Sequence, residues 1–561
     1  MHIIDISVVV IFSLLIIGCG LSFSAAGKNM KSFFSAGGAL PWWMSGLSLF
    51  MSFFSAGTFV VWGAIAYKHG WVAITIQWTM CLAGVLIALF IAPKWQKTGV
   101  LTAAEFIKQR LGLNVQRTYT YIFLLIASFS TGAFLYPVAK IVEVATGLSL
   151  EYTVIILGLL ILAYTAVGGL WAVIITDILQ FVVLTAAVLI VVPLSFEAIG
   201  GIENFIDKAP DDFFNSVNDE YSWEFIFAFG LYNLFFIAGN WSYIQRFTSV
   251  KTPKDAKKVG GLFAILYLIC PVVWMLAPMI YRTMNPNLVG FESEGAYLQM
   301  CKEVLPVGML GLMLAGMVFA TSSSINTSLN IAAGVISNDI YKNIKPDASQ
   351  ATLVKVGRIA TGVLGLITII VALLIPLLGG VVEVVMTMAA LTGGPLFLPP
   401  IWLLFSRYQT GKTILITTIF SLLVNAFFKF VSPWLFDFSL DRAQEMMMGV
   451  LFPVLMLTVF ELYLRAQRKT PACYENYLVE LSQIKPTAEL ITPEKSADNN
   501  HGIRVLGFGI LSTGAIMLSL AAIATTGKIE ITVISIGIFI LGGVLVFKFR
   551  SKAVKVRINE Q

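Results

Sequence analysis

The sequence predicts an all-α polytopic membrane protein with about 15 transmembrane helices. Of its 561 residues, 58% are hydrophobic and only 12% are charged, about half the charged fraction of a soluble domain. The apolar residues come in blocks of about 20, the length at which a helix spans the hydrocarbon layer. A lipid-facing backbone has to satisfy its own hydrogen bonds, and the ten-residue alternation of a membrane β-barrel is absent. We therefore expect a helical bundle.

Fifteen apolar blocks are expected to form the spans. The first begins with Met1 to Asp5, which contains an acid and no basic residue, so we interpret it as a retained helix and not a cleaved signal peptide. The block at 304–337 is long for one straight span, and we expect its lower part to continue into the cytoplasm. The blocks lie at about 4–27, 42–67, 71–93, 118–145, 151–168, 172–196, 223–244, 260–282, 304–337, 358–379, 381–406, 412–432, 446–464, 504–526 and 530–547.

Charge predicts the orientation of the spans. With the N-terminus outside, most of the 37 Lys and Arg residues fall in inner segments, and the outer loops are acidic. This pattern predicts a multi-pass protein of the cell's inner (plasma) membrane with a cytoplasmic C-terminus. The five scattered Cys residues are typical of small packing residues. His2, His69 and His501 lie at termini or in loops, no nucleophile–base or metal pair emerges, and we do not expect an enzyme.

Polar residues inside the apolar blocks are candidates for function, because such groups are costly in a membrane. Asp177 lies one to two turns inside a span, where it either holds a cation or bonds the backbone amides of a helix start. In residues 320–328, seven of nine side chains carry a hydroxyl or an amide. Hydroxyls that bond their own helix explain two or three of these residues, whereas a cluster of oxygens suits a hard cation such as sodium.

Two spans are interrupted by small and polar residues. Ser48, Ser52, Ser55, Gly57 and Thr58 interrupt the span at 42–67, and Asn233, Gly239, Asn240 and Ser242 interrupt the span at 223–244. Interruptions at corresponding places of two repeats indicate unwound helices at the central site of a transporter.

At these residues the chain resembles the solute:sodium symporter family, which includes sodium/glucose, sodium/galactose, sodium/proline and sialic acid transporters. The resemblance covers about residues 1–465, and its specificity comes from several motifs in the same order. These are Gly168-Gly169 through Thr176-Asp177 with Gln180, Asn240 to Gln245-Arg246, Ala320 with Ser323-Ser324, Leu329-Asn330 and Asp339-Ile340-Tyr341.

The resemblance implies a core of two inverted five-helix repeats, at 42–196 and 223–406. The remaining segments are a peripheral first helix with an inner loop at 1–41, an outer acidic loop at 197–222 and peripheral helices at 407–466. A cytoplasmic linker at 467–502 and a segment of two terminal helices with a basic tail at 503–561 complete the chain.

The resemblance also implies ligands for sodium. The first site would use the carbonyls of Met51, Phe54 and Ala320 and the hydroxyls of Ser323 and Ser324, with Asp177 nearby to supply negative charge. A second sodium would lie one turn further in, at Asp177, Ser324, Asn326 and Thr327, although Asn326 stands where the family has a hydroxyl.

For the solute, the resemblance implies binding residues on several core helices. Ser55, Thr58, Gln77 and Asn233 occupy polar solute positions, and Phe236 stands where sugar carriers place an aromatic inner gate. Phe53, Tyr267 and Thr387 replace an expected Asn, Lys and Gln, so the pocket is more aromatic than a glucose or galactose site. Sialic acid carriers use an Arg at the position of Ser130. Lys140 could bind a carboxylate, extend to the surface or pair with Glu143.

The predicted function is sodium-coupled import of a small polar organic solute, such as a sugar, polyol or sugar acid, by alternating access. The expected partners are sodium, the solute and the lipid bilayer, without nucleic acid, and the sequence is compatible with a monomer. The alternatives are a proton-coupled carrier that titrates Asp177, a carrier of an amino acid or monocarboxylate, and a solute sensor that does not transport.

Overall fold

The computed structural model describes residues 2–22, 40–100, 103–164, 170–468, 470–483 and 493–548. Within these ranges the regular structure is helical, apart from one isolated bridge between Leu40 and Val250. Eleven of the described helices are long and apolar enough to cross a membrane, or twelve if one bent pair counts as a single span. The predicted all-α class is confirmed. Gly168 and Gly169 lie outside the described residues, as do the inner loop at 23–39, the middle of the linker at 484–492 and the basic tail.

The helices of the first half follow the predicted blocks. They are α1 (Ile3–Leu21), α3 (Trp42–Met51), η2 (Thr58–Trp62), α4 (Gly63–His69), α5 (Val72–Leu86), η3 (Ile87–Ile91), α6 (Ala92–Thr98), α7 (Ala103–Leu111), α8 (Leu113–Thr146), α9 (Leu150–Tyr164), α10 (Leu170–Ile199) and α11 (Ile202–Lys208).

The helices of the second half begin after an acidic loop that ends at residue 222. They are α12 (Trp223–Gly239), α13 (Trp241–Thr248), α14 (Pro253–Met284), η4 (Gly290–Gly295), α15 (Ala296–Val304), α16 (Met309–Val335), η5 (Ile336–Tyr341), α17 (Lys342–Ile344), α18 (Gln350–Leu374), η6 (Ile375–Leu378), α19 (Val381–Thr392), η7 (Gly393–Phe397), α20 (Leu398–Leu403), α21 (Gly411–Ala426), η8 (Phe427–Val431), α22 (Ser432–Phe436), α23 (Arg442–Ala466), α24 (Ala472–Gln483), α25 (Pro493–Ile523) and α26 (Lys528–Lys548).

Four of the fifteen predicted blocks differ from single straight spans. The block at 42–67 is broken into α3, η2 and α4, while α1 and α9 are shorter apolar helices in their described parts. The block at 223–244 bends by 62° between α12 and α13. One boundary also needs correction, since α16 begins at Met309 and not at 304. Pro306 has no amide hydrogen to donate, and Gly308 has a φ of 90°, so the helix cannot run through them.

Regular structure also occurs in segments between the predicted blocks, among them α7, η4 and α15. Helix α11 lies within the predicted outer loop, and α24 lies within the predicted linker. Both helices are short and carry charged or polar residues among apolar ones, so composition alone did not separate them from loops.

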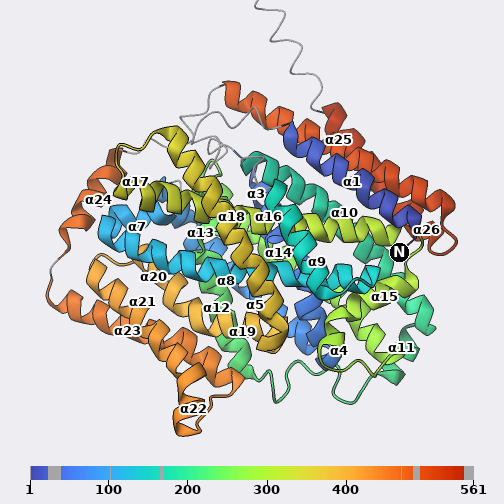
Figure 1. Cartoon of the computed structure of the whole chain (residues 1–561), viewed down its shortest axis with the longest axis horizontal. Coiled ribbons are helices and arrows are strands. Elements are labelled where there is room, and N and C mark those ends of the chain that lie inside the picture. Colours follow the sequence, from blue (N-terminus) through green and yellow to red (C-terminus); the bar gives the residue numbers. More distant parts are fainter. Residues whose placement is uncertain are drawn as a thin grey trace, which may run out of the picture.

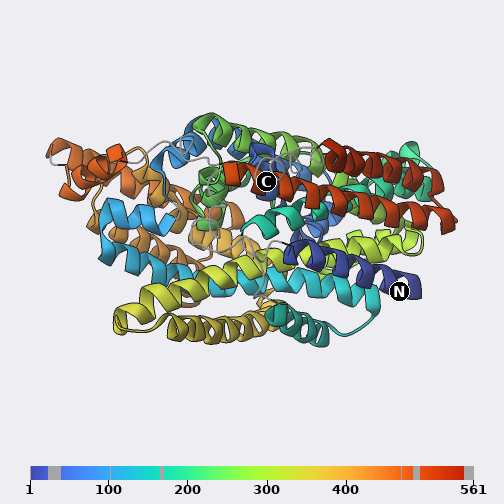
Figure 2. The same ribbon diagram turned by 90° about the horizontal axis from the view of Figure 1, so that it is seen from above.

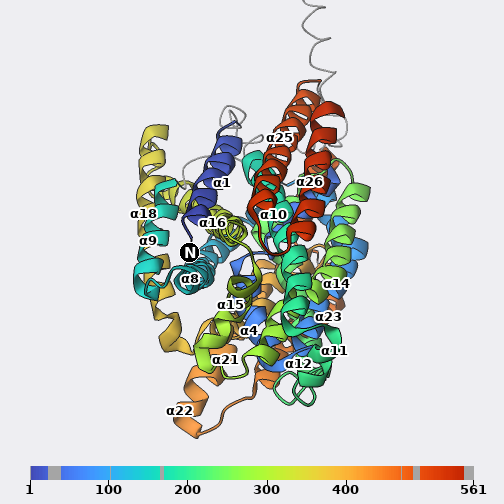
Figure 3. The ribbon, with the colours of Figure 1, turned by 90° about the vertical axis from the view of Figure 1, so that its right-hand side faces the viewer.

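The elements outside the two predicted repeats lie at opposite ends of the molecule. Helices α25 and α26 pack along each other, and α25 also packs on α1 and α10; Figures 1 and 3 show this group together. Helices α21, α22 and α23 lie at the other end of the view in Figure 1. Figure 2 shows an elongated molecule with the blue first helix and the red terminal helices at one end. Between these groups α3, α5, α10, α12, α14 and α16 pack against one another.

Candidate functional site

The break in the first core span changes the bonding of its backbone. Residues 52–55 leave the helix, the Ser55 amide donates to Thr58 Oγ1 at 3.1 Å, and the Thr58 amide donates to the Ser55 carbonyl at 3.0 Å. In a continuous helix these amides would bond the carbonyls of Met51 and Phe54. The break therefore diverts the helical donors of two carbonyls that the family resemblance assigns to sodium.

Helix α16 closes the other side of this break with its polar run. Thr321, Ser322 and Thr327 donate to carbonyls one turn back in α16, at 2.6–3.0 Å. Thr321 Oγ1 also accepts a hydrogen bond from the Ala56 amide at 3.2 Å, which ties α16 to the break. Bonding within the helix therefore accounts for three hydroxyls of the run. It does not account for Ser323, whose hydroxyl donates to Asp177 at 3.4 Å.

Asp177 joins three helices. Its Oδ2 accepts a hydrogen bond from Ser48 of α3 at 2.7 Å, and its Oδ1 accepts from Ser323 of α16. The residue is 6% exposed and lies seven positions after the first residue of α10, so it does not bond the amides of a helix start. Arg246 of α13 lies near enough to interact with it electrostatically. A buried carboxylate needs such compensating partners, and a bound cation would add another.

A cavity of about 240 Å³ lies between these helices. Its wall combines hydroxyl and amide groups with many aromatic rings, and its lining includes two charged side chains, Asp177 and Arg246. Ten of the sixteen predicted site residues line it. They are Phe53, Ser55, Thr58, Asp177, Asn233, Phe236, Tyr267, Ser323, Ser324 and Thr327.

The remaining predicted residues fall into two groups. Met51, Phe54 and Ala320 are buried behind the cavity wall, where a backbone carbonyl can face a site that the side chain does not line. Gln77, Asn326 and Thr387 do not line the cavity. Asn326 is thus the one residue of the predicted second sodium site that does not line the cavity.

Gln77 is an exception in its bonding. It is 2% exposed, and neither atom of its side-chain amide has a hydrogen-bond partner in the described part of the chain. A buried amide without partners costs about 1–3 kcal/mol. Gln77 therefore has an amide group that is free to form hydrogen bonds. It lies on α5, the helix whose Met80 lines the cavity.

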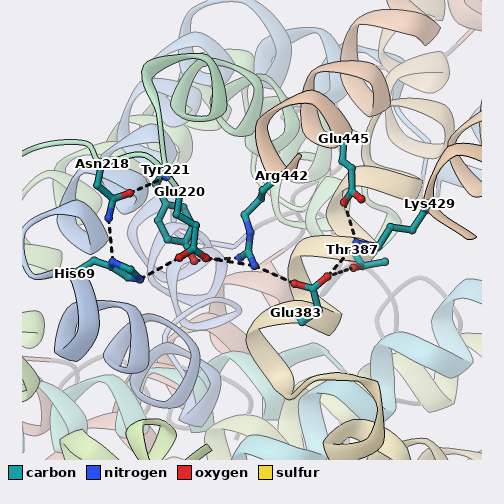
Figure 4. A network of polar contacts seen from close by, with 9 residues as sticks. All are labelled: His69, Asn218, Glu220, Tyr221, Glu383, Thr387, Lys429, Arg442 and Glu445. Carbon is teal, nitrogen blue, oxygen red and sulfur yellow. Dashed lines mark hydrogen bonds and ion pairs between the residues drawn. The ribbon is translucent and has the colours of Figure 1, made fainter. Parts of the chain in front are cut away.

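Thr387 lies in a different environment from the one predicted. Its hydroxyl donates to Glu383 at 3.3 Å, within a cluster of charged residues shown in Figure 4. The face of α19 that lines the cavity carries Val385, Met388 and Thr392, at spacings of three and four residues. Thr387 is one position away from that face, which on a helix rotates the side chain out of the cavity.

Several polar residues line the cavity although they were not predicted as site residues, and two of them, Asn240 and Arg246, belong to a motif recognised in the sequence. Asn240 ends α12 and caps α13, its Oδ1 accepting a hydrogen bond from the Ser242 amide at 3.0 Å. Ser242 and Arg246 follow on α13 and also line the cavity. The break at Asn240 was the available signal, because a cap at a bend brings the next turn of helix to face the same space.

Comparison with known proteins identifies the family. The model of the sodium:solute symporter family matches residues 33–432. The chain belongs to this family. It is therefore a sodium-coupled symporter of small polar solutes and a multi-pass membrane protein, and the family consists of transporters and not enzymes.

Several relatives of the symporter are similar along much of their length. A sodium/glucose cotransporter of Vibrio parahaemolyticus is 28% identical over 81% of this chain and 89% of its own. A sodium/sialic acid symporter of Aliivibrio fischeri is 27% identical over 63% of this chain and 73% of its own. A sodium/myo-inositol cotransporter of Mus musculus is 29% identical over 65% of this chain and 60% of its own.

A solved structure shares the fold. The substrate-bound outward-open state of a Na⁺-coupled sialic acid symporter superposes with a TM-score of 0.69 at 22% identity, covering 82% of this chain and 98% of that one. The predicted core of two inverted five-helix repeats is thereby confirmed as the fold of the symporter.

Proposed function

We propose that this symporter imports a small hydroxylated solute, a sugar, polyol or sugar acid, together with sodium through the central cavity by alternating access. One observation carries the proposal. The carboxylate of Asp177 is bonded to both Ser48 and Ser323, in the wall of a cavity whose other lining groups are mostly hydroxyls, amides and aromatic rings. The carboxylate can bind a cation, and the hydroxyls, amides and rings next to it can bind a neutral polar molecule.

The proposed sodium site lies between the break of the first core span and α16. The carbonyls of Met51, Phe54 and Ala320 and the hydroxyls of Ser323 and Ser324 are its ligands, all of them oxygen, which hard cations prefer. Asp177 supplies the negative charge that neutral ligands lack.

A second sodium at Asp177, Ser324, Asn326 and Thr327 stays a prediction. Ser324 and Thr327 line the same cavity as Asp177, but Asn326 does not. The Thr327 hydroxyl also donates to the Ser323 carbonyl. The support for the second ion is therefore weaker than that for the first.

For the solute, the residues at both acid-recognition positions favour a neutral sugar or polyol over a sugar acid. Lys140 pairs with Glu143, Nζ to Oε2, at 2.9 Å and does not line the cavity. Ser130 does line it, at the position where the resemblance places the Arg of sialic acid carriers. Aromatic rings in the wall suit the apolar faces of a sugar ring, and Ser55, Thr58 and Asn233 suit its hydroxyls.

Coupling would follow from the shared wall. Sodium at the proposed site holds α3 and the break against α16, which completes the solute pocket, and the solute tightens sodium binding by the same factor. In the proposed orientation the N-terminus lies outside the plasma membrane and the C-terminus on its cytoplasmic side, and sodium enters from outside. A potential of about 100 mV adds about 2.3 kcal/mol per net charge carried.

Uptake into proteoliposomes tests this function. A panel of neutral sugars, polyols and sugar acids is first screened for thermal stabilisation of purified protein in sodium, because a bound ligand stabilises the folded state. The best ligand is then followed in uptake with sodium or with choline outside. We expect uptake in sodium only. Uptake that is unchanged in choline and follows a proton gradient would instead support a carrier that titrates Asp177.

A further inference from the structure

A row of charged side chains crosses one end of the molecule, away from the cavity. Each side chain in this row lies within ion-pair distance of the next, and we call the row the ion chain (Figure 4). Its members are, in order, His69, Glu220, Arg442, Glu383, Lys429 and Glu445. Lys429 bridges Glu383 and Glu445 at 3.0 and 2.9 Å. None of the six residues lines the cavity or belongs to the proposed sodium or solute site.

The ion chain has two sides that meet at Arg442. His69 ends α4, and Glu220 lies in the loop before α12. Glu383, on the other side, lies in the first turn of α19. Arg442 Nη2 lies 3.4 Å from Glu220 Oε1 and 2.9 Å from Glu383 Oε2. Arg442 Nη1 also donates to the Tyr221 hydroxyl at 3.1 Å. Arg442 is therefore the member of the chain that contacts both sides.

Both sides continue into the cavity wall. Helix α4 follows directly on η2, whose Thr58 and Trp62 line the cavity, and α19 carries Met388 and Thr392 on its cavity-lining face. Arg442 thus connects two walls of the cavity from outside it. Because a helix is stiff, a displacement at these ends moves the lining residues one to three turns away.

The position between Glu220 and Glu383 requires a positively charged side chain, because both neighbours are carboxylates. The side-chain oxygen Oδ1 of Asn218 accepts a hydrogen bond from the main-chain amide of Tyr221 at 2.8 Å. The other end of this side chain, the NH2 group at Nδ2, therefore faces His69 Nδ1 at 2.9 Å. That Nδ1 must then accept, and neutral His69 carries its proton on Nε2, which faces Glu220 Oε2 at 3.4 Å. Three carboxylates then face two fixed cations, and removing Arg442 would leave Glu220 and Glu383 without their shared partner.

Glu220 remains charged at physiological pH. The hydrogen bond from His69, together with the positive charge of Arg442, lowers the pKa of Glu220 from 4.5 to about 2, against the effect of its partial burial. A carboxyl with a lowered pKa contributes stability above about pH 4.5, and this contribution is lost as the pH falls toward 2. The bridge to Arg442 therefore persists across the pH range in which uptake is measured.

We propose that Arg442 is a positioning residue for transport, which fixes the end of α4 relative to the end of α19 by binding Glu220 and Glu383 together. The proposal rests on the proposed function only in taking the cavity as the transport site.

Spin labels test the connection directly. Lys68→Cys at the end of α4 and Leu377→Cys just before α19 are both exposed positions. In a background with Cys81, Cys270 and Cys473 replaced by Ala, they report the distance between the two helix ends. In sodium we expect a narrow distance distribution for the otherwise unchanged protein. Arg442→Gln should broaden or shift it, and Lys429→Gln, which breaks pairs on one side only, should leave it unchanged.

Transport provides the second readout. For Arg442→Gln we expect turnover to fall about fivefold or more, with solute affinity in a binding assay altered less than twofold, whereas Lys429→Gln should keep both values. Arg442→Lys, which preserves the charge, should restore part of the turnover. Either an unchanged distance distribution or unchanged turnover in Arg442→Gln would overturn the proposal.

Two controls keep the outcome interpretable. If Arg442→Gln does not fold, as judged by size-exclusion chromatography, Glu220→Gln removes the same bridge from the other side and is judged by the same two readouts. The spin-label distances do not depend on which ion or solute is carried. A sodium-independent parent protein would thus contradict the proposed function, whereas an unaltered distance in the variant would contradict only the role of Arg442.

Discussion

The backbone groups at the two breaks of the core spans find their hydrogen bonds in different ways. Between α3 and η2, residues 52–55 leave the helix, and the hydroxyls of Thr58 and Thr321 take over amides near the break. Between α12 and α13 the helix is interrupted at Asn240 alone, whose side chain caps the next helix while the axis turns by 62°. In the first span, amide donors are diverted from main-chain carbonyls. In the second span, the bend turns the cavity wall, and the side chain of Asn240 bonds an amide at the start of α13.

In the proposed site, this difference separates sodium from the solute. Carbonyls whose helical donors are diverted suit an ion, because they supply oxygens at fixed positions without a side chain to order. A capped bend suits a solute, because it presents side chains of two helix segments to one space.

Asp177→Asn should have the largest effect, since it removes the charge on the ion side and keeps the size of the side chain. We expect the sodium concentration for half-maximal uptake to rise about 100-fold or uptake to be lost, while the amount of protein in the membrane is unchanged. Asp207→Asn in the exposed acidic loop is the matched control and should behave as the parent. Normal sodium dependence in Asp177→Asn would place the ion elsewhere.

Serine substitutions along α16 test which hydroxyls belong to the ion. Ser323→Ala and Ser324→Ala should each raise the sodium requirement about tenfold. Ser322→Ala is the control one position away, because the Ser322 hydroxyl bonds its own helix at 2.6 Å; we expect at most a twofold change. Sodium titrations of uptake measure all three. Equal effects at the three positions would indicate a general loss of packing and not an ion site.

Substitution of Asn240 tests whether the capped bend serves the solute more than the ion. Asn240→Ala removes the cap of α13, which typically costs about 1 kcal/mol, and should raise the KM for the solute several-fold with little change in the sodium requirement. Thermal unfolding measures the cost in stability, and paired titrations of solute and sodium measure the split. A larger change in the sodium requirement than in the KM would contradict the separation of the two breaks.

Gln77→Leu separates binding from folding. The substitution removes two buried polar atoms that lack partners, so stability without ligand should not fall, whereas sodium-dependent stabilisation by the solute should weaken. Thermal unfolding with and without solute measures both. A protein that is destabilised without ligand and binds solute normally would show that Gln77 has a structural role only.

Thr387→Val should have the smallest effect. Because the Thr387 hydroxyl bonds Glu383 outside the cavity, we expect the KM for the solute to change less than twofold. Thr392→Val, which alters the cavity-lining face of the same helix, is the positive comparison and should raise the KM more. The opposite order would return Thr387 to the solute site.

The sequence anticipated features that depend on neighbours along the chain. The break near Ser55 and the bend near Asn240 were visible as small and polar residues inside apolar blocks. Which residue of α19 lines the cavity was not visible in the sequence: Met388 lines it and Thr387 does not, and one residue rotates a helical side chain by about 100°. The pairing of Arg442 with Glu220 and Glu383 has no local signal, since three separate elements contribute its members.

By itself, the sequence determined that the protein is a bundle of membrane helices, because a lipid-facing backbone must satisfy its hydrogen bonds within each segment. Its ordered motifs also determined the family. Only the tertiary structure decided which polar side chains share the cavity, that Lys140 pairs with Glu143, and that Arg442 lies between Glu220 and Glu383. These are contacts between helices, and they depend on helix rotation and packing, which the hydrophobic pattern of a single span does not fix.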